Sequence, residues 1–308
     1  MAILDRALVT ILPAVPKPVV RRLAGRYIAG DELQDAVDVV RTVNGEGKMA
    51  TVDVLGEEIT SLDDARAIAG AYHDVFETID REGLDSNVSV KLTGLGLSLD
   101  FDLCRDNLDA LVADAAARDN FVRIDMEDSS TTDDTLRLYR ELREAGHERL
   151  GVVLQATLKR TLADVDALAD LRPNVRVCKG IYIEPPAIAF REFEAVRGNF
   201  VRVLEALLDA GCYVGIATHD DWLVDRAREA IAERGLGRDE YEFQMLLGVR
   251  PDLGDSLVQE GHRLRIYVPY GWHWYRYSIR RLQENPKIAG YVAADTFGRL
   301  LHPLRNGQ

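Results

Sequence analysis

The stretch LRIYVPYGWHWYRYSIRRLQENP, residues 264–286, carries the strongest structural signal in the chain. Its apolar beginning, LRIYVPYG, predicts a strand that ends near Pro269 and Gly271, because Pro and Gly interrupt strand pairing. A run of Tyr and Trp residues follows, and then a helix-like stretch with the adjacent Arg280 and Arg281. Arg binds carboxylates through parallel hydrogen bonds, so an Arg pair beside aromatic rings suits a small anion with an apolar body. A surface helix that happens to carry two Arg residues is the alternative explanation.

Seven further strand signals precede this one along the chain. They lie at residues 49–57, 88–96, 121–128, 151–157, 175–182, 212–220 and 241–249. Amphipathic segments separate them and begin near Ser, Thr or Asp, as helices do. Eight strands that alternate with helices predict an α/β fold, a (β/α)₈ TIM-like barrel.

An open, doubly wound sheet is the alternative fold. It receives no support from a GxGxxG pattern, because Leu99 stands where the third glycine would be. We expect residues 1–48 to form an N-terminal helical arm and residues 49–308 to form the barrel, which is the catalytic domain.

Composition narrows the class of protein. The chain has 308 residues, a net charge of -13 and a pI near 5.0, which argue against nucleic acid as a partner. Its three Cys residues are odd in number and lack CxxC spacing, so we expect reduced thiols, a cytoplasmic location and no metal site. The apolar N-terminal stretch is interrupted by Pro13, Pro16 and Pro18. It predicts no transmembrane span, and either packs on the barrel or contacts a membrane surface.

Polar residues follow most of the predicted strands, and in such barrels the active site lies at the C-terminal ends of the strands. Single residues have structural explanations: Asp125 can pair with Arg123, His219 can cap a helix, and Lys179 can end a strand. Burying many unpaired polar groups is costly, however, so their convergence predicts a ligand site.

Eight segments, taken in order, resemble monofunctional bacterial proline dehydrogenase. They are TVDVLGE, VSVKLTGLGL, VRIDMEDS, VVLQATLKRT, VRVCKGIYIEP, ATHD, EFQMLLGVR and YVPYGWHWYRYSIRRLQENP, and the resemblance covers the chain from about Arg26 to about Pro286. The resemblance implies a distorted (β/α)₈ barrel and a flavoprotein oxidoreductase with FAD as cofactor. It also implies oxidation of L-proline to 1-pyrroline-5-carboxylate, the first step of proline catabolism to glutamate, with electrons passed to a quinone.

The resemblance also assigns roles to individual residues. The catalytic residues it implies are Asp125, Arg176 and Lys91. The substrate-binding residues it implies are Lys91, Arg280, Arg281, Tyr267, Tyr277, Leu246 and Glu284. The flavin-binding residues it implies are Met126, Gln155, Arg176, Lys179, Gly180, Ile181, Thr218 and His219.

The expected chemistry fits these residue types. Imine formation removes a hydride from the carbon beside the ring nitrogen, and a flavin can accept it. The amine must first lose its proton, and cationic Lys91 and Arg groups nearby disfavour an ammonium ion. We therefore expect no dedicated strong base. Arg176 and Lys179 can stabilise negative charge on the reduced flavin or its phosphates.

Some positions depart from the family pattern. Ile181 stands where Ala is usual, Thr157 where Tyr is common, and Trp272, His273 and Arg276 also differ. These differences leave open a dehydrogenase of hydroxyproline or another cyclic amino acid. A Schiff-base enzyme using Lys91 or Lys179, and a barrel that binds without turnover, are further alternatives.

Besides the amino acid, the resemblance implies a quinone, a membrane surface and a second enzyme as partners. A quinone would accept the electrons, and this implies peripheral contact with the inner membrane. A separate pyrroline-5-carboxylate (aldehyde) dehydrogenase would act on the product.

Overall fold

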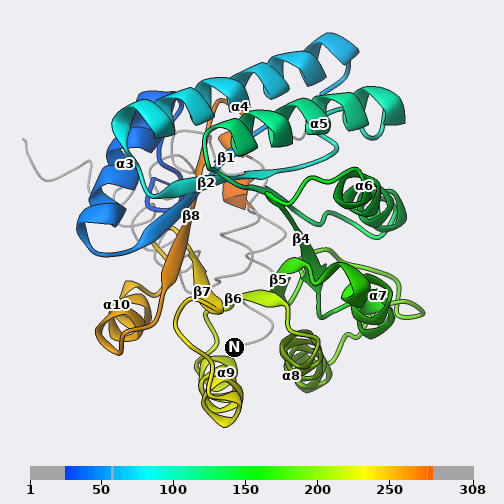
Figure 1. Ribbon diagram of the computed structural model, residues 1–308, viewed down its shortest axis with the longest axis vertical. Coiled ribbons are helices and arrows are strands. Elements are labelled where there is room, and N and C mark those ends of the chain that lie inside the picture. The colour runs from blue at the N-terminus through cyan, green and yellow to red at the C-terminus, as the bar shows by residue number, and fades with distance from the viewer. Residues whose placement is uncertain (1–24, 57–58, 276, 280–308) are drawn as a thin grey trace, which may run out of the picture.

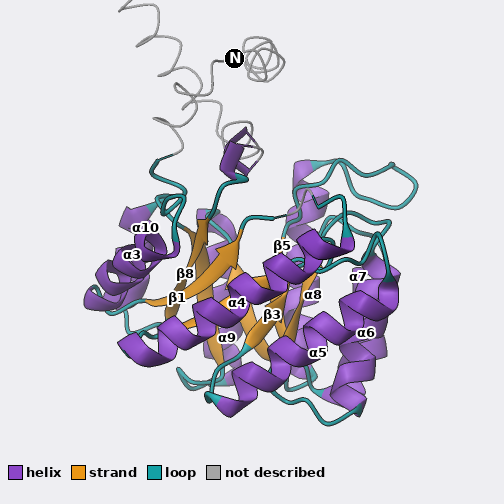
Figure 2. Cartoon of the chain, turned by 90° about the horizontal axis from the view of Figure 1, so that it is seen from above, coloured by secondary structure: helices purple, strands orange, loops and turns teal. Residues whose placement is uncertain are grey.

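Eight parallel strands form a closed barrel in the computed structural model, which describes residues 25–56, 59–275 and 277–279. The strands follow one another around the barrel in chain order, with helices outside them (Figures 1 and 2). Their bounds are β1 Met49–Val54, β2 Ser86–Val90, β3 Val122–Ile124, β4 Leu150–Gln155, β5 Asn174–Cys178, β6 Tyr213–Ala217, β7 Tyr241–Leu246 and β8 Leu264–Tyr270. The predicted barrel is confirmed, and the alternative of an open sheet is wrong.

The barrel closes where β8 pairs with β1, in a register that runs from Met49 opposite Arg265 to Val54 opposite Tyr270. Several strands end earlier than the apolar runs suggested. β2 stops at Val90, although its apolar run continues to Gly96. The following residues turn instead, because Gly96 has φ +108°, a left-handed conformation that glycine adopts without strain.

One or more helices connect each pair of successive strands. They are α4 Leu62–Glu82, α5 Phe101–Ala117, α6 Thr132–Glu144, α7 Thr161–Leu168 with η2 Ala169–Leu171, α8 Phe193–Asp209, α9 Asp221–Arg234 and α10 Pro251–Gln259. α4 shows how the sequence defines a helix: Ser61 accepts a hydrogen bond from the Asp64 N–H, and the Asp64 carboxylate accepts one from the Ser61 N–H. Gly83 ends this helix in a left-handed conformation.

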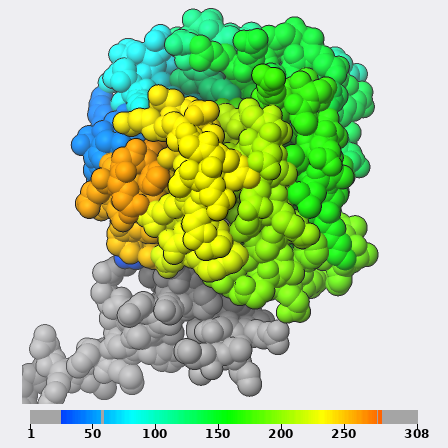
Figure 3. All heavy atoms as spheres, turned by 60° about the horizontal axis from the view of Figure 1, so that its bottom comes forward, coloured from blue at the N-terminus to red at the C-terminus, as the bar shows by residue number. Residues whose placement is uncertain are grey.

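A helix from the N-terminal side covers the strands β8 and β1. This helix is α3, Leu33–Gly45, and its residues Ala36, Val40 and Val43 are buried in the same core as the β1 residues Ala50 and Val52. In the space-filling view, α3 (blue), α10 (orange) and α9 (yellow) follow one another around the wall (Figure 3). The outer layer between α10 and α4 is therefore made by a helix that precedes β1.

The chain after β8 crosses the C-terminal end of the barrel. Tyr277 is buried in a small cluster with Tyr27, Ile28 and Leu55, and Tyr267 packs against this cluster. Leu55 follows β1 directly, and Tyr267 lies in the middle of β8. This crossing brings the aromatic segment over the ends of the strands, where the site was predicted. The first 24 residues of the predicted N-terminal arm lie outside the described residues.

The inside of the barrel is polar along much of its length. Buried polar side chains from the strands include Thr51, Asp53, Ser89, Arg123, Arg176, Glu242, Gln244 and Arg265. A glycine makes room for one of them: a Cβ atom on Gly215 would lie only 2.5 Å from Gln244 Nε2. TIM barrels commonly fill this space with branched apolar side chains. Among the described residues, no helix is long and apolar enough to span a membrane.

Candidate active site

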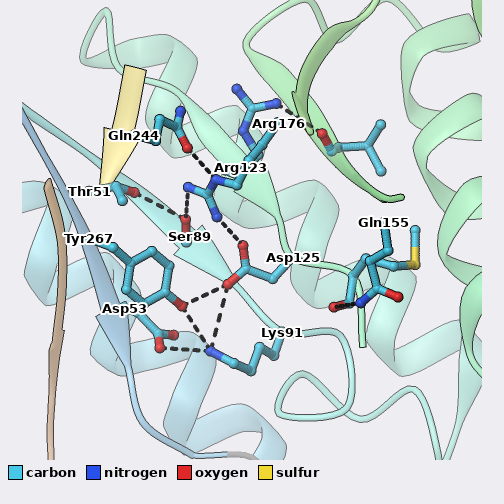
Figure 4. A network of polar contacts seen from close by, with 12 residues as sticks. Thr51, Asp53, Ser89, Lys91, Arg123, Asp125, Gln155, Arg176, Gln244 and Tyr267 are labelled. Atoms are coloured by element: carbon cyan, nitrogen blue, oxygen red, sulfur yellow. Dashed lines mark hydrogen bonds and ion pairs between the residues drawn. The ribbon is translucent and has the colours of Figure 1, made fainter. Parts of the chain in front are cut away.

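Five side chains meet near the C-terminal end of the barrel, three from β1, β5 and β8 and two from the residues directly after β2 and β3. We call them the mouth network: Asp53, Lys91, Asp125, Arg176 and Tyr267 (Figure 4). Lys91 Nζ lies 2.7 Å from Asp53 Oδ2, 3.1 Å from the Tyr267 hydroxyl and 3.7 Å from Asp125 Oδ2. The Tyr267 hydroxyl donates to Asp125 Oδ2 at 2.7 Å. Two cations and two carboxylates thus alternate around one phenol.

Arg176 connects the mouth network to polar side chains further inside the barrel. Its NH1 group donates to Asp125 Oδ1 at 2.5 Å, and its NH2 group donates to Ser89 Oγ at 3.0 Å. Its Nε–H donates to Gln244 Oε1. The guanidinium carbon lies 5.4 Å from the centre of the Tyr267 ring. Since every nitrogen of Arg176 has a partner, its orientation is fixed before any ligand binds.

Asp53 is the most deeply buried member of the mouth network, with a relative exposure of 0%. Tyr72 of α4 reaches it from outside the strands: its hydroxyl lies 3.2 Å from Asp53 Oδ1 and 2.7 Å from the Ser89 carbonyl oxygen. Burial and the nearby Asp53 charge raise the pKa of Tyr72 well above its usual value, so the phenol stays neutral. The sequence analysis missed both residues.

Tyr267 is also held in its neutral form. Burial, and then the charges of Asp125 and Asp53, raise its pKa well above the usual value. A neutral phenol can accept a hydrogen bond from Lys91 and donate one to Asp125 at the same time. Tyr267 therefore links Lys91 to Asp125 within the mouth network.

A second group of predicted residues surrounds the ends of β4 and β5. Gln155 Nε2 donates to the carbonyl oxygens of Met126 and Glu127, at 3.0 and 3.1 Å. Its Oε1 atom is buried and has no hydrogen-bond partner in the described part of the chain. Gly180 has φ +96°, and a Cβ atom there would lie 2.7 Å from Thr157 Cγ2. The backbone at Gly180 is thus closely packed, and Gln155 offers an unused acceptor.

The residues after β5 and β6 form an ion-pair cluster. Lys179 Nζ lies 2.5 Å from Asp220 Oδ2, and Arg197 NH2 lies 2.7 Å from Asp220 Oδ1. Thr218 Oγ1 accepts the Asp220 backbone N–H at 3.2 Å. His219 does not cap α9; its Nε2 atom accepts the Leu246 N–H at 2.9 Å.

The structure brings some predicted residues together and leaves others apart. Lys91, Asp125, Arg176 and Tyr267 share the mouth network. Leu246 pairs with Tyr267 across β7 and β8, and it also borders a cavity of about 440 Å³ between α3 and α10. Trp272 is exposed, at 71%, and Ile181 is half-exposed, at 44%. The predicted residues Arg276, Arg280, Arg281 and Glu284 lie outside the described residues. In the described part of the chain, no group of three or more His, Cys, Asp or Glu residues is placed to bind a metal.

A closed (β/α)₈ barrel with cations and carboxylates gathered at the C-terminal ends of its strands is the arrangement of a barrel enzyme. The family model described as "Proline dehydrogenase" matches residues 36–294. The chain belongs to the proline dehydrogenase family and is an oxidoreductase, as the resemblance implied.

Curated relatives agree with this assignment over most of the chain. Proline dehydrogenase 1 of Bacillus subtilis subsp. natto is 39% identical over 269 residues, which cover 87% of this chain and 89% of that protein. Proline dehydrogenase of Deinococcus radiodurans is 38% identical over 274 residues, 88% of each chain. The Escherichia coli protein named bifunctional protein PutA is 27% identical, and the match covers 26% of its length.

Solved structures share the fold. Proline utilization A (PutA) of Bdellovibrio bacteriovorus has a TM-score of 0.81 at 22% identity. The match covers 91% of this chain and 36% of that structure, so the chain spans about a third of its length.

Proposed function

We propose that this enzyme oxidises L-proline to 1-pyrroline-5-carboxylate with FAD as its cofactor and passes the electrons to a quinone. The single observation that carries the proposal is the mouth network, in which Lys91, Asp125, Arg176 and Tyr267 converge at the C-terminal end of the barrel. Family membership supplies the reaction class, and the mouth network supplies the polar groups that the reaction needs.

The carboxylate of proline is assigned to Arg280 and Arg281. Both follow Ile279 directly in the sequence, and Tyr277, two residues before Ile279, is buried at the barrel mouth beside Tyr267. An Arg pair can bind a carboxylate through parallel hydrogen bonds and so hold one end of the ring. Glu284 is assigned to pair with these Arg residues, and Tyr277 and Leu246 are assigned to the ring of proline.

The mouth network supports a reaction without a dedicated strong base. Asp125 already accepts hydrogen bonds from Arg176 and Tyr267, and Lys91 lies 3.7 Å away. Both oxygens of this carboxylate are therefore already engaged as hydrogen-bond acceptors. We therefore expect proline to react after its amine has lost a proton to water. The cation of Lys91 then favours the uncharged amine over an ammonium ion.

The residues around β4 and β5 fit a flavin. The buried Oε1 atom of Gln155 lacks a partner, and a ring N–H would satisfy it. Gly180 has no side chain, so the Thr157 side chain can pack directly against the backbone after β5. Arg176 and Lys179 would provide positive charge, and Met126, Ile181, Thr218 and His219 complete the assigned set. When bound, FAD supplies the hydride acceptor.

A second candidate function is the oxidation of hydroxyproline or another cyclic amino acid. The half-exposed Ile181 favours it, because a larger side chain than the usual Ala changes the space available beside the ring. A Schiff-base reaction has less support. Lys91 and Lys179 are each engaged by a carboxylate, Asp53 and Asp220, so neither amine is placed as an open nucleophile.

Two further partners belong to the proposal. A membrane quinone would require transient contact with the inner membrane, and the apolar segment with Lys17, Arg21 and Arg22 is the assigned contact. Deleting residues 1–24 should then weaken liposome binding and quinone reduction. Unchanged binding and reduction would remove this part. The product opens to an aldehyde in water, so a separate aldehyde dehydrogenase would consume it.

Steady-state oxidation of L-proline with a soluble quinone tests the proposed function. We expect turnover, with 1-pyrroline-5-carboxylate identified by mass spectrometry. The same assay with trans-4-hydroxy-L-proline separates the two candidates through the ratio of kcat/KM values. A purified, FAD-loaded protein that oxidises neither amino acid would contradict both.

A further inference from the structure

A line of buried side chains continues below the mouth network, on β7 and β8. Gln244 accepts the Nε–H of Arg176, and its own Nε2 group donates to Glu242 Oε1. Glu242 in turn binds Arg265, whose Nε and NH2 groups lie 2.8 and 3.1 Å from its two oxygens. All four side chains are buried in the barrel. This line therefore connects the Glu242–Arg265 ion pair to Arg176 of the mouth network.

The chemistry at each end of the Gln244 amide allows only one orientation. The Arg176 Nε–H can only donate, and the Glu242 carboxylate can only accept. The amide must therefore turn its oxygen to Arg176 and its nitrogen to Glu242. Burial opposes ionisation of Glu242, but the charge and hydrogen bonds of Arg265 outweigh this effect and lower its pKa to about 2. Glu242 thus remains an acceptor throughout the neutral pH range.

The neighbouring strand prevents Gln244 from moving aside. Gly215 of β6 faces it, and even a Cβ atom there would lie 2.5 Å from Gln244 Nε2. The amide is therefore held between the backbone of β6, Glu242 and Arg176. Arg176 has its other nitrogens on Asp125 and Ser89, so Gln244 supplies the third fixed point of the guanidinium plane.

We propose that Gln244, oriented by Glu242, is a positioning residue that holds the Arg176 guanidinium in the plane needed at the flavin. This inference rests on the proposed function, because that function assigns Arg176 to the flavin. Neither Gln244 nor Glu242 contacts the substrate in this proposal. Removing the amide would let Arg176 tilt towards Asp125 and Ser89, and its positive charge would shift away from the reacting ring.

The variant Gln244→Met tests the proposal, because Met fills a similar volume without the amide. Its matched control is Tyr213→Phe, which removes a 3.0 Å hydrogen bond to Glu242 Oε2 from the same layer and leaves Gln244 untouched. We expect Gln244→Met to lower kcat by roughly tenfold to 100-fold, as the loss of outer hydrogen-bond partners does elsewhere. KM should change less, and the midpoint potential of the bound flavin should become more negative. Tyr213→Phe should change neither kcat nor the potential.

Two combined variants test whether the effect of Gln244→Met acts through Arg176. In an Arg176→Lys background, which lacks the Nε–H, Gln244→Met should add little further loss. The exchange Glu242→Gln with Gln244→Glu keeps one carboxylate and one amide in the pair, so it should recover part of the rate lost in Gln244→Glu alone. This exchange also provides the test if Gln244→Met does not fold.

The possible outcomes distinguish a failure of the proposed function from a failure of the positioning role. A wild-type protein that binds no flavin and oxidises no proline contradicts the proposed function itself. A wild-type protein that does both, with a folded Gln244→Met variant of unchanged flavin potential and kcat, overturns the positioning role. Equal losses in Gln244→Met and Tyr213→Phe would also overturn it, because they would indicate a general effect of disturbing the layer.

Discussion

Two clusters of buried charged side chains lie inside this barrel, and they differ in their position along it. In the lower cluster, Glu242 has Arg265, Tyr213 and Gln244 as partners, and Arg265 also donates to the carbonyl oxygen of Ala50 at 2.7 Å. In the mouth network, the ionic groups lie at the ends of the strands, where the chain opens into loops. The same pairing chemistry thus joins strands deep inside the barrel and, in the proposed function, forms the ligand site at its mouth.

The lower cluster should have the largest effect on stability. Arg265→Met leaves Glu242 charged and buried without its cation, and breaking such a pair costs about 3–5 kcal/mol. Urea unfolding measures this loss. The double variant Arg265→Met with Glu242→Leu should recover most of it, because the buried pair is then removed as a whole. A single variant as stable as the wild type would show that the lower cluster does not support the fold.

The mouth network should have the largest effect on activity. Lys91→Met removes a cation that binds both Asp53 and Tyr267, and we expect kcat to fall roughly 100-fold to 1,000-fold, the range found when a single charge-stabilising donor is removed. Stopped-flow reduction with L-proline at matched FAD content measures the effect. Lys159→Met, at an exposed lysine on the rim, is the control and should keep the wild-type rate. Wild-type kinetics for Lys91→Met would remove Lys91 from the reaction.

The two clusters also contain one tyrosine each, and these give a smaller, matched contrast. Tyr267→Phe removes the donor to Asp125, and a hydrogen bond to a charged group is worth about 1.5–3 kcal/mol, so kcat/KM should fall at least about tenfold. Tyr213→Phe removes a donor to Glu242 and should lower the free energy of unfolding without changing kcat/KM. Equal effects of both variants on kcat/KM would contradict the division between the clusters.

The ion pairs of Asp220 with Lys179 and Arg197 should have the smallest effect on stability, and only at acidic pH. Burial disfavours the charged form of Asp220, but hydrogen bonds from Arg197 and Lys179 outweigh it and lower its pKa from 3.8 to about 2. Because the folded state has the lower pKa, Asp220 stabilises the fold above about pH 4, and this contribution is lost as the pH falls towards 2.

Asp220→Asn should therefore make the free energy of unfolding less dependent on pH between about pH 4 and 2. Urea unfolding at several pH values measures this. Asp102→Asn, at an exposed carboxylate, is the control. An unchanged slope for Asp220→Asn would show that the ion pairs do not persist in solution.

The order of strands could be predicted from the sequence because each apolar run had a turn signal and a helix pattern after it. The lengths were less predictable: the apolar run continues to Gly96, but β2 stops at Val90 and the following residues turn. Nothing in the sequence pattern indicated that α3 would cover β8 and β1. That position depends on contacts between residues far apart in the chain, because α3 packs against both the first and the last strand.

The candidate site was predictable where a charged residue followed an apolar run, as at Lys91 and Asp125, or interrupted one, as at Arg176. Asp53 carried the same signal, a carboxylate within the apolar strand β1, and was missed because no partner for it was evident in the sequence. Tyr72 gave no signal, because an aromatic residue on the apolar side of α4 is expected to be an ordinary core residue. Its contact with Asp53 exists only in three dimensions.

The visible absorption spectrum of the purified, FAD-loaded protein, recorded before and after adding L-proline without oxygen, tests the central claim most directly. The account predicts oxidised flavin bands that bleach on addition of proline. A protein that cannot be reconstituted with FAD, or whose flavin bands persist with proline and with every other cyclic amino acid, would contradict it.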